Sequence, residues 1–206
     1  MARPVLLKRG AEAELRRARW HHREVVEKHR VPKAYRLGSL DAALRGERTR
    51  AEARLMADAR KAGVAVPVIY DVDLAEDRIT MSFVPGPTAK EVLDRGGSRA
   101  RALCREIGRL AAKLHRAGIV HGDLTPSNLI WSRGRLWAID FSLGDRTAEA
   151  EAQGVDLHLL REALVAGHPR GASYFEEVAR AYRRAFPRAR AALAKVDEIR
   201  LRGRYT

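Results

Sequence analysis

The chain has 206 residues, of which 46% are hydrophobic, and its 40 Lys and Arg against 26 Asp and Glu give a net charge of +14. This length predicts one medium domain or two small lobes, and the hydrophobic content excludes a disordered basic tail. The chain has a single cysteine, which predicts a protein without disulfides. It has no run of the ~20 apolar residues needed to cross a membrane, and its start does not read as a signal peptide. Together these features predict a cytoplasmic protein without a membrane anchor.

The first part of the chain is predicted to be rich in strands. Val5–Leu7 and Glu24–Lys28 read as two strands on either side of a turn at residues 9–11. Alternation along the second strand places Val26 on the same face as Lys28. Pro32 ends this strand because proline has no N–H to donate to the ladder.

A long helix is predicted next, from Leu40 to Lys61. Ser39 is the expected N-cap and Gly63 lies just past the end. The apolar contacts of this helix are expected from Leu40, Leu44, Leu55 and Met56.

Two further strands, Val66–Asp71 and Arg78–Val84, precede the strongest break in the sequence, Pro85–Pro87. We therefore expect a strand-rich lobe over residues 1–84 and a mostly helical lobe over residues 85–206.

The second lobe is predicted from caps and apolar spacing. Thr88 caps a short helix through Leu93, and Ser98 caps a longer helix that ends at Gly118. Leu103, Ile107, Leu110 and Leu114 form one apolar stripe on the longer helix. Further along the chain, the pattern predicts a hairpin of Leu129–Trp131 with Arg135–Ile139, then helices over Val155–Ala166, Tyr174–Phe186 (behind a Ser173/Glu176 capping box) and Ala189–Leu201.

An acidic island interrupts the basic chain, since residues 119–160 carry three basic and six acidic side chains. Within it, Asp123 and Asn128 lie five residues apart in one loop, and Asp140 follows the hairpin. Two carboxylates and an amide oxygen are hard ligands of the kind that Mg²⁺ prefers. One carboxylate can stay outside the metal shell to orient a hydroxyl group or a water molecule, which is the division of labour that phosphoryl transfer requires.

A fixed positive charge for the phosphates is expected from Lys28, held by Glu52 on the long helix. Lys8 and Lys33 are alternatives to Lys28, although strand alternation favours Lys28. Glu47 competes with Glu52 on the same helix.

In order and spacing these residues resemble the protein-kinase signature set: His121-Gly122-Asp123…Asn128 stands at the catalytic loop, and Asp140-Phe141-Ser142 at Asp-Phe-Gly. The resemblance implies ATP and Mg²⁺ as cofactors, Asp123 as catalytic carboxylate, and Asn128 and Asp140 as metal ligands. It implies an α+β fold, a minimal bilobal kinase with a reduced helical C-lobe. The residues implied to contact ATP are Arg9, Gly10, Ala11, Glu12 and Ala13 in a shortened phosphate strap, with Val26, Lys28, Glu52, Met81 and Phe83.

The 15 residues between Asp140 and Asp156 leave no room for an ordinary activation segment. Beyond these motifs, the chain resembles the small atypical kinase subunit of the KEOPS/EKC complex from Leu7 onward. The most diagnostic segments are Lys28–Lys33 and the basic tail Arg200–Arg204, and residues 47–54 resemble the family as well.

This second resemblance implies a serine/threonine kinase and ATPase that supports threonylcarbamoylation of adenosine in tRNA. The implied partners are the threonylcarbamoyltransferase subunit, other KEOPS subunits and tRNA, with no membrane. A RIO-type kinase, a small-molecule kinase of the aminoglycoside type and a non-enzymatic tRNA-binding adaptor are the alternatives. Ser142 in place of Gly, and Pro126 where a second Thr is common, depart from the family pattern. The net charge alone fits either nucleic-acid binding or an arginine-rich codon usage.

Overall fold

The computed structural model of this chain describes residues 4–10 and 12–202. The chain divides into two compact units, and residues 58–66 group with the second although the sequence around them belongs to the first. The first unit comprises Met1–Ala57 and Pro67–Val84, and the second comprises Asp58–Val66 and Pro85–Thr206. None of the described helices is long and apolar enough to cross a membrane.

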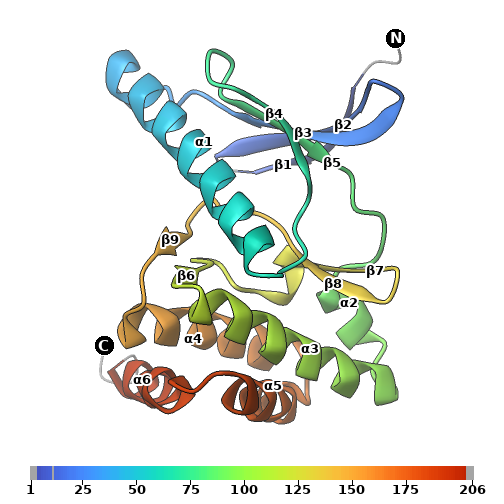
Figure 1. The fold of residues 1–206 in the computed structure, drawn as a ribbon, viewed down its shortest axis with the longest axis vertical. Helices are drawn as coiled ribbons and strands as arrows, with labels where there is room; N and C mark the ends of the chain where they lie inside the picture. The colour runs from blue at the N-terminus through green and yellow to red at the C-terminus, as the bar shows by residue number, and fades with distance from the viewer. Residues whose placement is uncertain (1–3, 11, 203–206) are drawn as a thin grey trace. The chain divides into compact units, whose positions relative to one another are not determined.

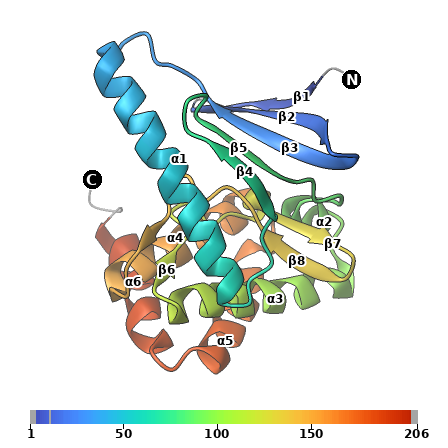
Figure 2. The ribbon, with the colours of Figure 1, turned by 45° about the horizontal axis from the view of Figure 1, so that its top comes forward.

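The first unit is built on an antiparallel sheet in the order β1-β2-β3-β5-β4 (Figure 2). β1 is an edge strand, and β3 lies in the middle with β2 and β5 as neighbours. The strands are β1 (Val5–Arg9), β2 (Ala13–Trp20), β3 (Arg23–Arg30), β4 (Ile69–Asp73) and β5 (Arg78–Ser82).

Strand β2 is absent from the sequence prediction, which placed only a turn and a connection there. The strand has no apolar alternation, and its one buried side chain is Glu14, which pairs with Arg9 at 2.6 Å and Arg16 at 2.8 Å. Backbone pairing with both β1 and β3 makes this segment a strand. β3 ends at Arg30, just before Val31-Pro32, as predicted.

Helix α1 (Gly38–Lys61) begins two residues earlier than predicted, so Ser39 lies inside the helix and is not its N-cap. The Asp41 N–H donates to the Leu37 carbonyl, which opens the helix at Gly38. Leu55 is buried as expected, but Leu40 is 52% exposed. The buried stripe of the first four turns is polar instead, because its fully or nearly fully buried side chains are Asp41, Thr49 and Glu52.

The second unit is mostly helical, and its long helices lie side by side as two pairs, α3 with α5 and α4 with α6 (Figure 1). Two short two-stranded ladders, β6 with β9 and β7 with β8, complete it. The elements are α2 (Ala89–Asp94), α3 (Gly97–Arg116), β6 (Ile119–Val120), the 3₁₀ turn Pro126–Asn128, β7 (Leu129–Ser132), β8 (Arg135–Ala138), β9 (Asp145–Arg146), α4 (Ala150–Gly167), α5 (Gly171–Ala185) and α6 (Ala189–Arg202).

Several features that short-range sequence patterns predict for this unit are confirmed. Thr88 caps α2 in a complete capping box with Glu91. The β7–β8 hairpin turns at Arg133-Gly134 with positive φ at both residues (50° and 74°), as a two-residue turn requires. The predicted stripe on α3 is buried: Leu103, Ile107, Leu110 and Leu114.

Two predicted caps are wrong, because the N-caps of α3 and α5 are Gly96 and Arg170, so that Ser98 and Ser173 lie inside the helices. α5 begins early because Gly171 packs against the end of α4, where a Cβ would lie 2.1 Å from the Leu164 carbonyl oxygen. The glycine therefore decides where this helix starts.

Candidate active site

In the first unit, β3 and α1 bring Lys28 and Glu52 together. The Lys28 Nζ lies 2.5 Å from the Glu52 Oε1, and both side chains are at most 5% exposed. The sequence missed a third member, Arg30, which lies two residues beyond Lys28 on the same strand face and whose Nη2 donates to the Glu52 Oε2 at 2.6 Å. One buried carboxylate is thus shared by two cations, which holds the Lys28 ammonium in place.

The predicted phosphate strap is tied to α1 by an ion pair. Arg48 on α1 donates to both carboxylate oxygens of Glu12 at 2.6 Å, and this pairing lowers the pKa of Glu12. The Gly10 N–H donates to the Ala13 carbonyl at 2.9 Å, which closes the turn. Ala11 lies outside the described residues. The Glu12 side chain is therefore engaged by arginine and fastens this turn to α1.

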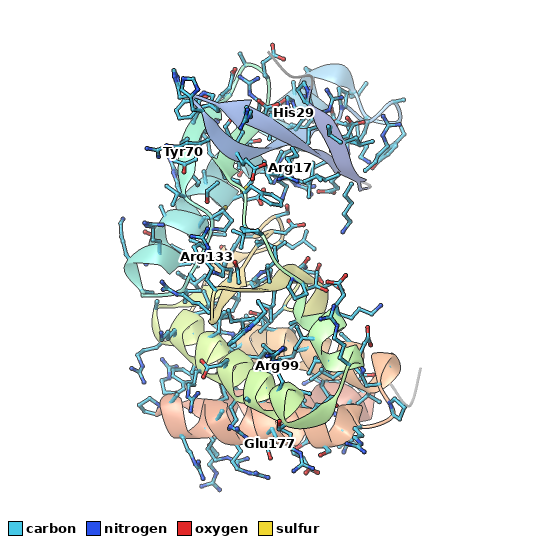
Figure 3. All side chains as sticks on the ribbon, turned by 90° about the vertical axis from the view of Figure 1, so that its right-hand side faces the viewer. Arg17, His29, Tyr70, Arg99, Arg133 and Glu177 are labelled. Carbon is cyan, nitrogen blue, oxygen red and sulfur yellow. The ribbon has the colours of Figure 1, made fainter. Side chains whose placement is uncertain are left out.

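The other residues predicted to contact ATP lie on two adjacent strands of the first unit or directly after one of them. Val26 of β3 and Met81 of β5 are direct register partners, and Arg17 of β2 faces Val26 on the other side. The Phe83 N–H donates to the Glu24 carbonyl at 3.2 Å, which continues the pairing past the end of β5. The Arg17 guanidinium lies 4.4 Å from the centre of the Phe83 ring, and Figure 3 labels Arg17 on the sheet.

In the second unit, the loop after β6 brings Asp123 and Asn128 together. The Asn128 Nδ2 donates to the Asp123 Oδ2 at 2.7 Å and to the Asp123 carbonyl at 2.9 Å. The Asn128 N–H donates to Thr125, which winds the loop into a 3₁₀ turn that starts at Pro126. Since the amide nitrogen is engaged by Asp123, the Oδ1 is the atom of the Asn128 side chain that has the chemistry to bind a cation.

Asp140 follows the β7–β8 hairpin and has a φ of 64°, an uncommon backbone conformation for a residue with a side chain. The Ser142 hydroxyl donates to the Asp140 Oδ1 at 2.6 Å. Ile139, the residue before it, is held twice: its N–H donates to the Asn128 carbonyl and its carbonyl accepts from the His121 Nε2, both at 3.0 Å. These bonds fix the backbone from which the Asp140 carboxylate projects.

Close packing explains why a glycine stands at position 122, where the kinase signature has Arg. Its φ is 78°, and a Cβ on it would lie 1.9 Å from the carbonyl oxygen of Leu143. The loop that carries Asp123 and the turn that carries Asp140 therefore touch through their backbones, which only glycine permits.

Asp156 on α4 organises this loop, and the sequence analysis gave it no role. Its Oδ2 accepts the His121 N–H at 2.6 Å and its Oδ1 accepts the Gly122 N–H at 2.7 Å. The Nε2 of His115 lies 3.2 Å from the same carboxylate, and its Nδ1 lies 2.8 Å from the Tyr182 hydroxyl. The signal that could have found Asp156 is an acidic residue between two apolar neighbours, Val155 and Leu157, on α4.

His121 itself positions the loop and is not exposed to substrate. It is completely buried against Phe141, with ring centres 4.5 Å apart. Burial lowers the pKa of His121, so the ring is neutral at pH 7, and the proton on Nε2 is the one donated to Ile139. A buried neutral imidazole of this kind is suited to hold a backbone turn.

Among the described residues no group of three or more His, Cys, Asp or Glu side chains is arranged to hold a metal ion. The donor set of the second unit is smaller, with an amide oxygen at Asn128 and a carboxylate at Asp140. Mg²⁺ keeps several waters and is commonly bound through one or two protein groups together with substrate phosphates. The donors therefore fit Mg²⁺ that arrives with a nucleotide.

Comparison with known proteins identifies the family of this chain. Residues 17–155 match the RIO domain family. Over 97% of its length, the chain is 42% identical to the KEOPS complex subunit Bud32 of Pyrococcus abyssi, of which it covers 96%. The chain belongs to the Bud32 family. It is also 45% identical, over 76% of its length, to a probable serine/threonine-protein kinase BUD32 homolog of Archaeoglobus fulgidus, of which it covers 74%.

A second group of relatives consists of longer proteins. The chain is 36% identical to a probable bifunctional tRNA threonylcarbamoyladenosine biosynthesis protein of Methanobrevibacter smithii, but spans only 37% of it. Among solved structures, WaaP in complex with acyl carrier protein matches 95% of this chain with a TM-score of 0.62 at 19% identity. These findings confirm the kinase-like α+β fold and the kinase family, and a kinase-like RIO domain implies ATP binding.

Proposed function

We propose that this Bud32 family member is a Mg-ATP-dependent serine/threonine kinase and ATPase of a KEOPS complex, and supports formation of N6-threonylcarbamoyladenosine in tRNA. The observation that carries the proposal is the 42% identity to a named KEOPS subunit over nearly the whole of both chains. The names of the longer relatives add support, because they place the same domain in tRNA threonylcarbamoyladenosine biosynthesis.

In the second unit, Asp123 is the proposed catalytic carboxylate, and it orients the hydroxyl or water that attacks. Its partner Asn128 keeps it in one position and presents an amide oxygen to the metal side. Asn128 and Asp140 are the proposed Mg²⁺ ligands. When bound, the ion neutralises charge on the phosphates, and the remaining work of the protein is positioning.

In the first unit, Lys28 is the proposed phosphate contact, held by Glu52 and supported by Arg30. Met81 and Phe83 form the proposed adenine contact, and Val26, which is paired with Met81 across the sheet, is a further proposed ATP contact. Arg9, Gly10, Ala11, Glu12 and Ala13 form the proposed strap over the phosphates. Within the strap, Glu12 fastens the turn to α1 through its ion pair with Arg48.

The proposed partners are the tRNA-threonylcarbamoyltransferase subunit, other KEOPS subunits and tRNA bound through the assembly, and the proposed compartment is the cytoplasm. A kinase with 15 residues between Asp140 and Asp156 has little sequence from which to build a peptide-docking platform, which favours work within an assembly.

Mg-dependent ATP turnover by the full chain tests the metal assignment. Asp140→Ala is expected to abolish turnover, whereas Asp145→Ala, which removes an exposed carboxylate on β9, leaves it unchanged. Turnover of the Asp140 variant at the parental rate would reject the assignment of Asp140.

Turnover measured with the transferase subunit and tRNA tests the assembly. We expect the rate to rise when both are added. If the isolated chain instead phosphorylates free proteins as fast as the assembly hydrolyses ATP, then a RIO-type protein kinase acting alone describes it better.

A further inference from the structure

The second unit carries a groove between α3 and α5 that none of the site residues line. The groove has a volume of about 470 Å³, and its side chains include Arg105 and Arg109 from α3 and Arg180 and Arg184 from α5. Glu177 is its one acidic lining residue. Figure 3 labels Glu177 on α5, and also Arg99 near the start of α3.

Glu177 arranges the groove without neutralising it. Its carboxylate lies 3.0 Å from the Arg180 Nη1 and 3.6 Å from the Arg105 Nη1. Both arginines remain about half exposed, at 53% and 44%, so their other N–H groups face solvent. Glu106 of α3 pairs with Arg109 beside the groove, so two carboxylates stand against four guanidinium groups, which still leaves a surplus of positive charge in a defined place.

The positive charge continues along α3 in both directions. Arg101, Arg105, Arg109 and Lys113 are exposed at four-residue intervals, and this row is called the α3 basic track below. A rise of ~1.5 Å per residue separates successive members by about 6 Å and makes the track about 18 Å long. A neighbouring hollow adds Arg170 beside Arg101, and another of about 140 Å³ adds Arg135 beside Lys113.

We infer that the α3 basic track and the α3–α5 groove bind the phosphate backbone of RNA. A track of this length fits a run of phosphates rather than a single anion. Guanidinium groups bind phosphate oxygens through paired N–H donors, and release of counterions drives such binding. The choice of RNA rests on the proposed role in tRNA modification, whereas the charge and the shape of the site do not depend on it.

An acidic protein partner is disfavoured by the lining of the groove. Apart from the charged residues, the groove is lined by Ala181 and Ala185. Protein interfaces draw most of their affinity from buried aromatic or large apolar anchors, and two alanines do not form a pocket for one.

The test is binding of a fluorescent tRNA transcript to the full chain without nucleotide, measured from 50 to 300 mM salt. The groove variant changes Arg105, Arg109, Arg180 and Arg184 to Gln. The control variant changes four exposed arginines elsewhere to Gln, and so carries the same net charge: Arg50, Arg54, Arg60 and Arg190.

We expect the groove variant to bind at least tenfold more weakly at low salt, with a log–log salt slope shallower by about 3 if all four side chains contact phosphates. The control variant should retain most of the affinity. A third variant with Lys at the four groove positions should recover most of the binding, and thermal unfolding checks that all variants fold.

Equal losses in the groove and control variants would overturn the inference, because net charge alone would then explain binding. Tighter binding to poly-glutamate than to the tRNA transcript would identify an acidic protein as the occupant. Since no ATP is present, the result stands apart from the proposed function, and a groove variant with normal ATP turnover but weak RNA binding separates the two.

Discussion

A nearly completely buried carboxylate stands at the candidate site of each compact unit, but the two carboxylates hold different partners. Glu52 in the first unit accepts from two cationic side chains, Lys28 and Arg30. Asp156 in the second unit accepts from two backbone N–H groups, those of His121 and Gly122, with His115 as a third neighbour. Both carboxylates are 1% exposed.

The first unit therefore contains a charge network, formed by Glu52 with Lys28 and Arg30. The second contains a backbone clamp, formed by Asp156 with the N–H groups of His121 and Gly122. Two cations and one carboxylate leave positive charge in the first unit, which is useful where phosphates are to be bound. Backbone donors carry no net charge, so the clamp in the second unit fixes the loop of Asp123 without weakening its negative charge. The two units thus prepare opposite electrostatic environments with the same chemical group.

Removal of the Glu52 charge is the change with the largest expected effect. Glu52→Gln leaves Lys28 and Arg30 buried without their shared anion, and loss of one partner of a buried ion pair costs about 3–5 kcal/mol of the free energy of unfolding. Chemical denaturation measures this. The matched control is Glu47→Gln, which changes an exposed glutamate of the same helix. If the two variants unfold at the same denaturant concentration, the charge network does not stabilise the first unit.

The backbone clamp is tested next through Gly122. Gly122→Ala places a Cβ 1.9 Å from the Leu143 carbonyl oxygen, whereas Gly134→Ala adds one in open space at a similar φ of 74°. The positive φ costs about 1–2 kcal/mol at both positions, and overlap adds about 1–3 kcal/mol at Gly122 alone. Urea unfolding of both variants gives the difference, and equal losses would mean that the two loops can separate without cost.

A smaller effect is expected at the far end of the clamp. Tyr182→Phe removes the hydroxyl that meets His115, and loss of one buried hydrogen bond costs about 1 kcal/mol. Burial raises the pKa of Tyr182, so the hydroxyl is protonated at any neutral pH. Tyr174→Phe on the same helix is the control. If Tyr182→Phe leaves the midpoint of thermal unfolding unchanged, the hydrogen bond between Tyr182 and His115 does not contribute to the clamp.

The smallest expected effect is on the rate at which a thiol reagent labels the chain. Cys104 is the only cysteine of the chain and is fully buried on α3, and burial raises the pKa of its thiol to about 12. Because a raised pKa reduces the reactive thiolate at pH 8, labelling by a thiol reagent should be slow in the native chain and fast in urea. Cys104 should be labelled faster in the Gly122→Ala variant than in the Gly134→Ala variant. The reverse order would show that the clamp does not stabilise α3.

The sequence determined the features that depend on neighbours along the chain. The Thr88 cap, the hairpin of Leu129–Trp131 with the strand that follows it and the buried stripe of α3 each need only local spacing, and each is confirmed. Strand alternation favoured Lys28 over Lys8 and Lys33, whereas the choice of Glu52 as its partner rested on the resemblance to protein kinases. The roles proposed for both residues remain predictions.

Only the tertiary structure decided the features that depend on distant partners. β2 is a strand because β1 and β3 flank it, although its own side chains are mostly charged. Arg30 belongs to the charge network because α1 brings Glu52 over two positions of β3. Asp156 and Gly122 matter because α4 and Leu143 approach the loop after β6, and a contact between segments more than 20 residues apart leaves no periodic trace in the sequence.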